Sequence, residues 1–187
     1  MPFIIPGMSF YTRSGDDGTT GLLGPGRVYK HHPRIEALGA LDEASAALGL
    51  ARASCLAQET PPLLRQAQKD LYRLMTEVAA TPETAPTFQG IDAARVEWLE
   101  AQTDAISQKV TMPRQFILPG DTPSGAALSL ARTIVRRAER RVSELFDSSE
   151  LSNPELLRYL NRLSSLCFVL EILENQTAGR STSLAKE

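Results

Sequence analysis

Apolar residues recur every three or four positions along most of this chain, which is the period of an amphipathic helix. Proline inside a helix costs about 3 kcal/mol, so helices are expected in the long proline-free windows. These windows cover residues 34–60, 63–81, 87–112, 124–153 and 155–187. Three of them show apolar stripes, formed by Leu64, Ala67, Leu71, Leu74 and Val78; by Ile91, Ala94, Trp98, Ala101 and Ala105; and by Leu128, Ala131, Val135, Ala138, Val142 and Leu145.

The last window begins with a helix-start signal. Ser152 and Asn153 precede Pro154 and Glu155, an order typical of a cap, a proline at the first helical position and an acid in the first turn. No strand–helix–strand alternation is visible anywhere in the sequence. The pattern therefore predicts an all-α fold, a five-helix bundle in one domain over residues 1–187, with residues 1–10 and 177–187 flexible.

Composition narrows the class of protein. The 187 residues suffice for one domain with its own core. The longest stretch without Asp, Glu, Lys or Arg is residues 1–12, which is too short to span a membrane. This stretch also lacks the basic residues that begin a secretory signal. Met8 is an alternative start of translation. The net charge of −2 gives no overall attraction to nucleic acid or anionic membranes. We therefore expect a cytoplasmic protein that binds neither.

Cysteine and histidine offer little chemistry. Cys55 and Cys167 stand far apart and are expected to be core thiols rather than a disulfide or a zinc site. His31 and His32 are adjacent and precede Pro33, which is a poor arrangement for a metal site or a Ser/His/Asp relay. No metal-ligating residues are predicted.

The N-terminal segment is rich in groups that bind phosphate. Five of the twelve glycines fall between Gly15 and Gly26, and Arg13, Arg27 and Lys30 lie in the same segment with several threonines. Glycine lets backbone N–H groups turn toward an anion. Neither a Walker A motif nor GxGxxG occurs, so an ordinary flexible arm is an equally good interpretation of the composition.

Five arginines fall within residues 131–141. Arg132, Arg136 and Arg140 repeat every four residues and share one flank of the helix, whereas Arg137 and Arg141 share the other and are expected to be solvated. Arg132 lies close to the apolar stripe, so a polyphosphate or carboxylate partner is expected for it and for Arg136. The spacing of Glu139 would let it orient these two. No aromatic residues are interleaved among the arginines, which disfavours nucleic-acid binding.

An acid continues an apolar stripe at Asp42, which follows Ile35, Leu38 and Leu41 at helical spacing. A buried carboxylate requires a cation, and Arg132 is the best candidate; a carboxylate at a wet seam is the alternative. Asn161 is likewise a polar residue among leucines, and a buried amide must be hydrogen-bonded. It is expected to make either a helix-packing contact or a ligand contact.

The sequence resembles the PduO-type ATP:cob(I)alamin adenosyltransferase family in five segments that occur in the family's order. They are YTRSGDDGTT (11–20), RIEALGALDE (34–43), FILPGD (116–121), ARTIVRRAER (131–140) and YLNRL (159–163). The resemblance implies a five-helix bundle, a homotrimer with active sites between subunits, and transfer of the 5′-deoxyadenosyl group of ATP to the cobalt of reduced cobalamin. It implies ATP, Mg²⁺ and cobalamin as ligands, and a reductase and a B12-dependent acceptor enzyme as partners.

The resemblance also implies roles for single residues. The glycine-rich segment would close over ATP, Asp42 would pair with Arg132 across the subunit interface, and Phe116 would lie beside the corrin and keep one cobalt face free of a ligand. The implied catalytic residues are Asp42, Phe116 and Arg132, and the implied nucleotide-binding residues are Thr12, Arg13, Gly15, Asp16, Gly18, Lys30, Arg136, Glu139 and Asn161.

The residues and the resemblance agree that no general base is needed, since reduced cobalt is itself the nucleophile. The chain departs from the family at Asp121, where PGG is usual, at Ser165, where an acid is usual, and at Ala44-Ser45 in place of LN. A non-catalytic module with the same fold, which binds ATP or delivers a corrinoid, is the alternative function.

Overall fold

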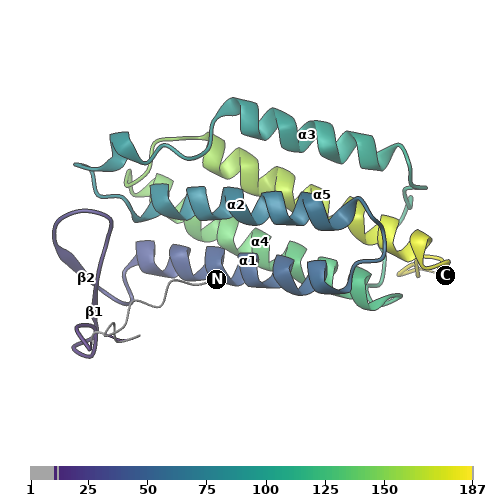
Figure 1. Ribbon diagram of the computed structural model, residues 1–187, viewed down its shortest axis with the longest axis horizontal. Helices are drawn as coiled ribbons and strands as arrows, with labels where there is room; N and C mark the ends of the chain where they lie inside the picture. Colours follow the sequence, from purple (N-terminus) through teal and green to yellow (C-terminus); the bar gives the residue numbers. More distant parts are fainter. Residues whose placement is uncertain (1–10, 12, 187) are drawn as a thin grey trace, which may run out of the picture.

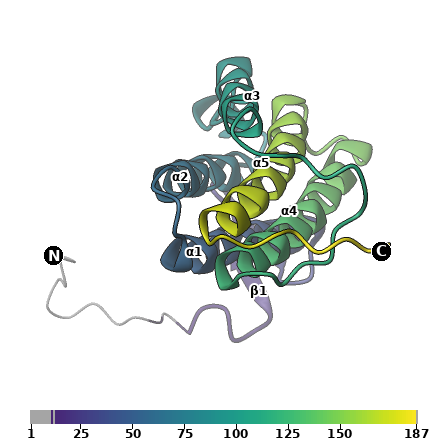
Figure 2. The ribbon, with the colours of Figure 1, turned by 90° about the vertical axis from the view of Figure 1, so that its right-hand side faces the viewer.

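Five helices account for most of the computed structural model, which describes Tyr11 and residues 13–186. Four of them run side by side along the long axis, and the fifth, α3, lies on the outside of the bundle (Figures 1 and 2). The predicted five-helix bundle is confirmed. The helices are α1 (Pro33–Ser54), α2 (Thr60–Ala79), α3 (Ala93–Ser107), α4 (Pro123–Asp147) and α5 (Glu155–Thr177).

A small hairpin extends from one end of the bundle, ahead of α1 (Figure 1). Its antiparallel strands are β1 (Thr19–Gly21) and β2 (Arg27–Tyr29), and a single 3-10 turn, η1 (Ala85–Thr87), follows α2. The hairpin is the ordered form of the glycine-rich segment and was not predicted. At its turn, Gly24 approaches the segment that follows α2 so closely that an added Cβ would lie 2.1 Å from Thr81 Oγ1, so only glycine fits there.

Two of the three predicted apolar stripes form the core. Every predicted stripe residue of α2 and α4 is fully buried. The third predicted stripe is wrong at Ala94, Ala101 and Ala105, which are exposed on α3, although Ile91 is buried and Trp98 packs against the core. The buried residues there are Val96, Leu99 and Ile106, since α3 rests on α5 by one narrow face and the larger side chains bury more apolar area in it.

Cys167 is buried as predicted, whereas Cys55 is half-buried; both are free thiols. Burial is the main cause that raises the pKa of each thiol to about 12. No helix in the described part of the chain is both long enough and apolar enough to cross a lipid bilayer.

Arg34 ties the hairpin end of the bundle together. Its side chain is buried, and Nη1 donates to the carbonyl oxygens of Val78 and Ala80, each at 2.8 Å. Its Nε pairs with the Glu150 carboxylate at 2.7 Å. One guanidinium therefore joins the start of α1, the end of α2 and the loop between α4 and α5, which fixes the base from which the hairpin projects.

The opposite end is fixed where α4 begins. Thr122 Oγ1 accepts a hydrogen bond from the Gly125 N–H at 2.9 Å and donates to Asn175 Oδ1 on α5 at 2.8 Å. A Cβ at Gly125 would lie 2.5 Å from Asn175 Oδ1, so the absent side chain permits this contact. At the start of α5, Asn153 Oδ1 accepts from the Glu155 N–H at 3.1 Å, but Pro154 is itself the cap residue and no side chain caps the helix, so the predicted helix start is off by one residue.

Candidate functional site

The glycine-rich segment folds into a compact loop that carries a cation. The N–H of Lys30 donates to the Gly18 carbonyl at 2.9 Å. The Lys30 ammonium lies over Gly15, where an added Cβ would be 3.2 Å from Nζ. That ammonium makes no hydrogen bond or ion pair to any other residue from 13 to 186, so its charge is available to a ligand. Arg13 and Asp16 belong to the same loop and are exposed; Thr12 lies outside the described residues.

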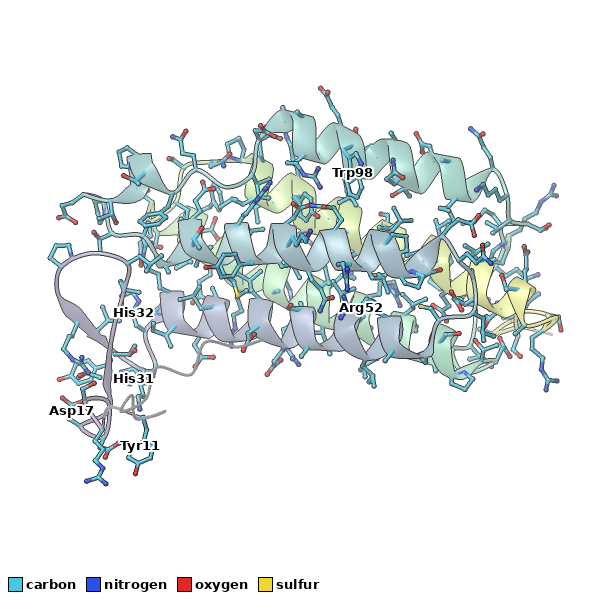
Figure 3. The ribbon with its side chains drawn as sticks, in the orientation of Figure 1. Tyr11, Asp17, His31, His32, Arg52 and Trp98 are labelled. Carbon is cyan, nitrogen blue, oxygen red and sulfur yellow. The ribbon has the colours of Figure 1, made fainter. Side chains whose placement is uncertain are left out.

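Internal hydrogen bonds give this loop its shape. Arg27 donates from Nε to Thr19 Oγ1 at 2.8 Å and from Nη2 to the Ser14 carbonyl at 2.6 Å. Asp17 accepts from the Thr19 N–H at 2.9 Å, and this hydrogen bond is the main cause that lowers the pKa of the Asp17 carboxyl. Arg27 therefore serves the loop itself, which leaves Lys30 and the exposed Arg13 to face an anion. Figure 3 shows Asp17, Tyr11 and His31 gathered here, at the hairpin end of the molecule.

The exposed flank of α4 carries most of the predicted arginines. Arg137 pairs with Glu43 of α1, and Arg141 pairs with Glu144 at 3.3 Å; both arginines are about half exposed, which confirms the predicted solvated face. Arg136 is exposed, and Arg140 donates to its carbonyl oxygen at 3.0 Å. The Arg136 guanidinium has no ion pair within the described residues.

Glu139 does not orient the arginines as predicted. Its Oε1 accepts from Asn161 Nδ2 at 3.1 Å, because α4 and α5 pack closely and bring the two side chains together. Asn161 Oδ1 in turn accepts from Arg162 Nη1 at 2.8 Å. Asn161 is thus a half-buried packing contact whose amide nitrogen and oxygen each have one hydrogen-bond partner, and Ser165 is exposed one turn later.

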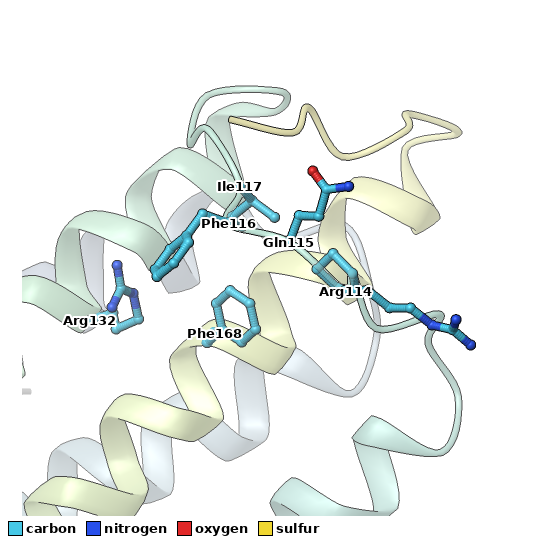
Figure 4. A pocket seen from close by; sticks show the side chains of 7 residues that line it. Arg114, Gln115, Phe116, Ile117, Arg132 and Phe168 are labelled. Carbon is cyan, nitrogen blue, oxygen red and sulfur yellow. The ribbon is translucent and has the colours of Figure 1, made fainter. Parts of the chain in front are cut away.

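A pocket of about 390 Å³ opens at the other end of the bundle. Phe116 projects from the loop before α4, opposite Arg132 of α4 and Phe168 of α5 (Figure 4). Phe116 is 89% exposed, so it is not a core aromatic. An exposed phenylalanine beside an arginine and a second ring suits a flat apolar ligand that also carries negative charge. Phe168 was missed in the sequence, where it is hidden within the leucine-rich run of α5.

The prediction of a buried Asp42 is wrong for the single chain. Asp42 is exposed, because the buried face of α1 runs through Ala37, Leu41 and Ala44 and leaves Asp42 to one side. Within the described residues it pairs with no cation, Arg132 included. The Nε atom of Arg132 is buried and has no hydrogen-bond partner in that part of the chain. Pairing of the two residues between subunits stays a prediction.

Glu171 of α5 lies near Arg132 and also lacks a hydrogen-bond partner within the described residues. It is 1% exposed, and both carboxylate oxygens are buried without a hydrogen bond to any described residue. Burial raises the pKa of this carboxyl to about 7, although the nearby Ser129 hydroxyl and the charge of Arg132 oppose the rise. The signal in the sequence was a lone acid between Leu170 and Ile172.

The hairpin loop and the pocket are far apart in one chain. The Arg34–Glu150 ion pair places the end of α4 beside the start of α1. Arg132 lies 15 residues before that end of α4, which is roughly 20 Å along the helix. Lys30 and Phe116 therefore belong to opposite ends of the bundle (Figure 1). No three metal-ligating side chains gather within the described ranges.

These features define a helical-bundle protein with one region suited to phosphate and another suited to a flat apolar ligand. The sequence model of the family described as cobalamin adenosyltransferase matches residues 10–174. The chain belongs to this family.

Similarity to individual relatives also supports membership of this family. The chain is 40% identical over 181 residues to the corrinoid adenosyltransferase PduO of Citrobacter freundii, covering 96% of this chain and 53% of the relative. It is 39% identical to a corrinoid adenosyltransferase of Mycobacterium tuberculosis, covering 88% of each. The chain thus spans about half the length of the PduO relatives it matches and most of the mycobacterial one.

The fold matches a solved structure along nearly the whole length of this chain. A variant of the PduO-type ATP:corrinoid adenosyltransferase from Lactobacillus reuteri, complexed with cobalamin and ATP, is 30% identical to this chain. The TM-score is 0.89, and the match covers 96% of this chain and all of that one.

Proposed function

We propose that this protein is an ATP:cob(I)alamin adenosyltransferase. The observation that carries the proposal is the pocket, in which Phe116, Phe168 and Arg132 form an aromatic and cationic surface on the fold of an enzyme that binds cobalamin and ATP. In the reaction, Co(I) attacks C5′ of ATP, a cobalt–carbon bond forms, the C5′–oxygen bond breaks, and triphosphate leaves with the bonding electron pair.

The chain's own residues would position the reactants and stabilise the leaving group. Lys30 and the loop of Arg13, Gly15, Asp16 and Gly18 would hold ATP, with Thr12 completing the segment. Arg132 and Arg136 would neutralise charge that grows on the triphosphate. Glu139 and Asn161 would shape the wall of this site as a hydrogen-bonded pair. Mg²⁺ would enter with ATP, held mainly through phosphate oxygens.

The active protein is proposed to be a homotrimer with sites between subunits. The roughly 20 Å of α4 between Arg132 and the hairpin end of the bundle supports this, because one subunit cannot easily bring Lys30 and Arg132 to one triphosphate. The exposed Asp42 and the unpartnered Nε of Arg132 would then meet across the interface. A reductase and a B12-dependent acceptor enzyme are the proposed partners, in the cytoplasm.

The direct test is to mix the purified protein with chemically reduced cobalamin and MgATP without oxygen and to follow the visible spectrum. Formation of adenosylcobalamin with release of triphosphate supports the proposal. Tight ATP binding without product would favour the non-catalytic ATP-binding or corrinoid-delivery module.

Phe116→Ala should slow the reaction from cob(II)alamin with a reductant at least 10-fold more than the reaction from cob(I)alamin. A bulky apolar side chain can exclude water and base from one cobalt face, which makes cob(II)alamin easier to reduce. Both rates are measured at saturating ATP. Phe88→Ala is the control, because Phe88 follows η1 and does not line the pocket, and equal losses in the two assays for Phe116→Ala would reject this role.

Lys30→Ala should raise the KM for ATP about 10-fold and leave the KM for cobalamin unchanged. A charge-assisted contact to a phosphate contributes about 1.5–3 kcal/mol. The control is Lys69→Ala, an exposed lysine on α2 far from the hairpin. An unchanged KM for ATP would show that the hairpin loop does not bind the phosphates.

A further inference from the structure

The segment that carries Phe116 has little structure of its own. Residues 110–121 connect α3 to α4 and belong to no helix or strand. Within the described part of the chain, the backbone of this segment makes two hydrogen bonds, and both go to the C-terminal residues. Because the Phe116 side chain is 89% exposed, its own contacts cannot fix its position. The position of the ring therefore depends on what holds the backbone.

The C-terminal residues hold it by pairing as a short strand. Ile117 and Leu184 form an antiparallel bridge. The Leu118 N–H donates to the Ser183 carbonyl at 2.9 Å, and the Ala185 N–H donates to the Phe116 carbonyl at 2.8 Å. Figures 2 and 4 show this C-terminal segment beside the loop that leads into α4. The flexibility predicted for residues 177–187 stays a prediction, but residues 183–185 have partners.

Asp121 joins the two segments through its carboxylate. Oδ1 accepts from Ser183 Oγ at 2.7 Å, and Oδ2 accepts from the Ser183 N–H at 2.9 Å. These hydrogen bonds lower the pKa of Asp121, so the carboxylate stays ionised at neutral pH. The next residue, Thr122, is the buried cap of α4, so Asp121 is attached to a rigid point of the bundle.

We propose that Asp121 is a positioning residue for Phe116. By holding Ser183, it fixes residues 183–185 against residues 116–118 and so holds the phenyl ring at its place in the pocket. The inference rests on the proposed function, because it assumes that Phe116 acts at the corrin. It assigns a role to the carboxylate by which this chain departs from the PGG pattern of the family.

The first test measures whether Asp121 holds the two segments together, and it needs no activity assay. In Asp121→Ala, hydrogen exchange of the Leu118 and Ala185 amides should be about 10-fold faster than in the unmodified protein, because these two N–H groups donate the hydrogen bonds that join the segments and both bonds would open more often. Ser183→Ala should have a smaller effect in the same direction, and Ser183→Thr, which keeps the hydroxyl donor, should restore slow exchange. Unchanged exchange in Asp121→Ala would overturn the proposal.

The second test measures the consequence for the reaction. Asp121→Ala should lower the rate from cob(II)alamin with a reductant about 10-fold and the rate from cob(I)alamin less than 2-fold, with no change in the KM for ATP. Displacements of about 1 Å can have effects of this size. The spectrum of bound cob(II)alamin should show a smaller fraction without an axial ligand. The matched control is Ser181→Ala, because Ser181 is exposed and makes no hydrogen bond to a described residue.

A double variant separates the possible results. In a Phe116→Ala background, Asp121→Ala should add no further loss, since the residue it positions is gone. An additional loss there, or equal losses in the two cobalamin assays, would overturn the proposal while leaving the transferase function in place. If the unmodified protein makes no adenosylcobalamin, the proposed function fails, and the exchange measurement still decides whether Asp121 holds the segment.

Discussion

Replacing Arg132 by alanine should lower the rate of adenosylcobalamin formation from cob(I)alamin by about 10²–10³-fold. Removing one preorganised donor from developing negative charge has effects of this size, equivalent to about 2.7–4 kcal/mol in the barrier. The Nε atom of Arg132 is buried and lacks a partner in the described chain, so the guanidinium is not already satisfied by its own subunit. The measurement is the initial rate at saturating MgATP, without oxygen.

The controls for Arg132 come from the same helix and from the proposed partner. Arg137→Ala removes an exposed arginine that already pairs with Glu43 and should change the rate less than 2-fold. Asp42→Ala should lower the rate and weaken the trimer together if Asp42 meets Arg132 between subunits. A rate for Arg132→Ala within 3-fold of the unmodified protein would contradict the role assigned to this arginine.

Proline positions and helical periodicity were enough to predict the fold because most of the core depends on local patterns. The stripes of α2 and α4 are buried as predicted, since those helices lie inside the bundle and a 3.6-residue period has to face one core. The stripe of α3 failed for a physical reason. Alanine counts as apolar in a periodic pattern, but a peripheral helix gains more free energy by burying the larger side chains of Val96, Leu99 and Ile106 than by burying alanines.

The site was only partly predictable because its contacts are non-local. Asp42 was placed in a stripe by spacing, yet the actual buried face of α1 runs through Leu41 and Ala44, one position away. Glu139 was assigned to arginines of its own helix, whereas the packing of α5 gives it Asn161. The pairing of Asp121 with Ser183 joins residues 62 positions apart, which no periodicity can reveal.

Glu171→Gln should stabilise the protein above about pH 7, by up to about 3 kcal/mol, which corresponds to a rise in Tm of several degrees. The carboxyl has a pKa of about 7 in the folded chain against 4.5 when unperturbed. Between these values the folded state binds more protons than the unfolded state, so stability falls as pH rises through this window. Above it the charged carboxylate is buried without partners, and glutamine removes that charge.

Thermal unfolding measured at several pH values tests this expectation. The gain from Glu171→Gln should be largest near pH 8 and should shrink toward zero as the pH falls below 4.5, where the acid becomes neutral in both states. Glu174→Gln, three residues later, is the matched contrast. The buried Glu174 carboxylate accepts hydrogen bonds from the N–H groups of Leu56 and Ala57, at 2.7 and 3.2 Å, so the protein should lose stability when this group is neutralised. A gain for Glu171→Gln that does not vary with pH would show that shape, not charge, controls the site. A loss at pH 8 would mean instead that the carboxylate finds a cation in the assembled protein, with Arg132 as the nearest candidate.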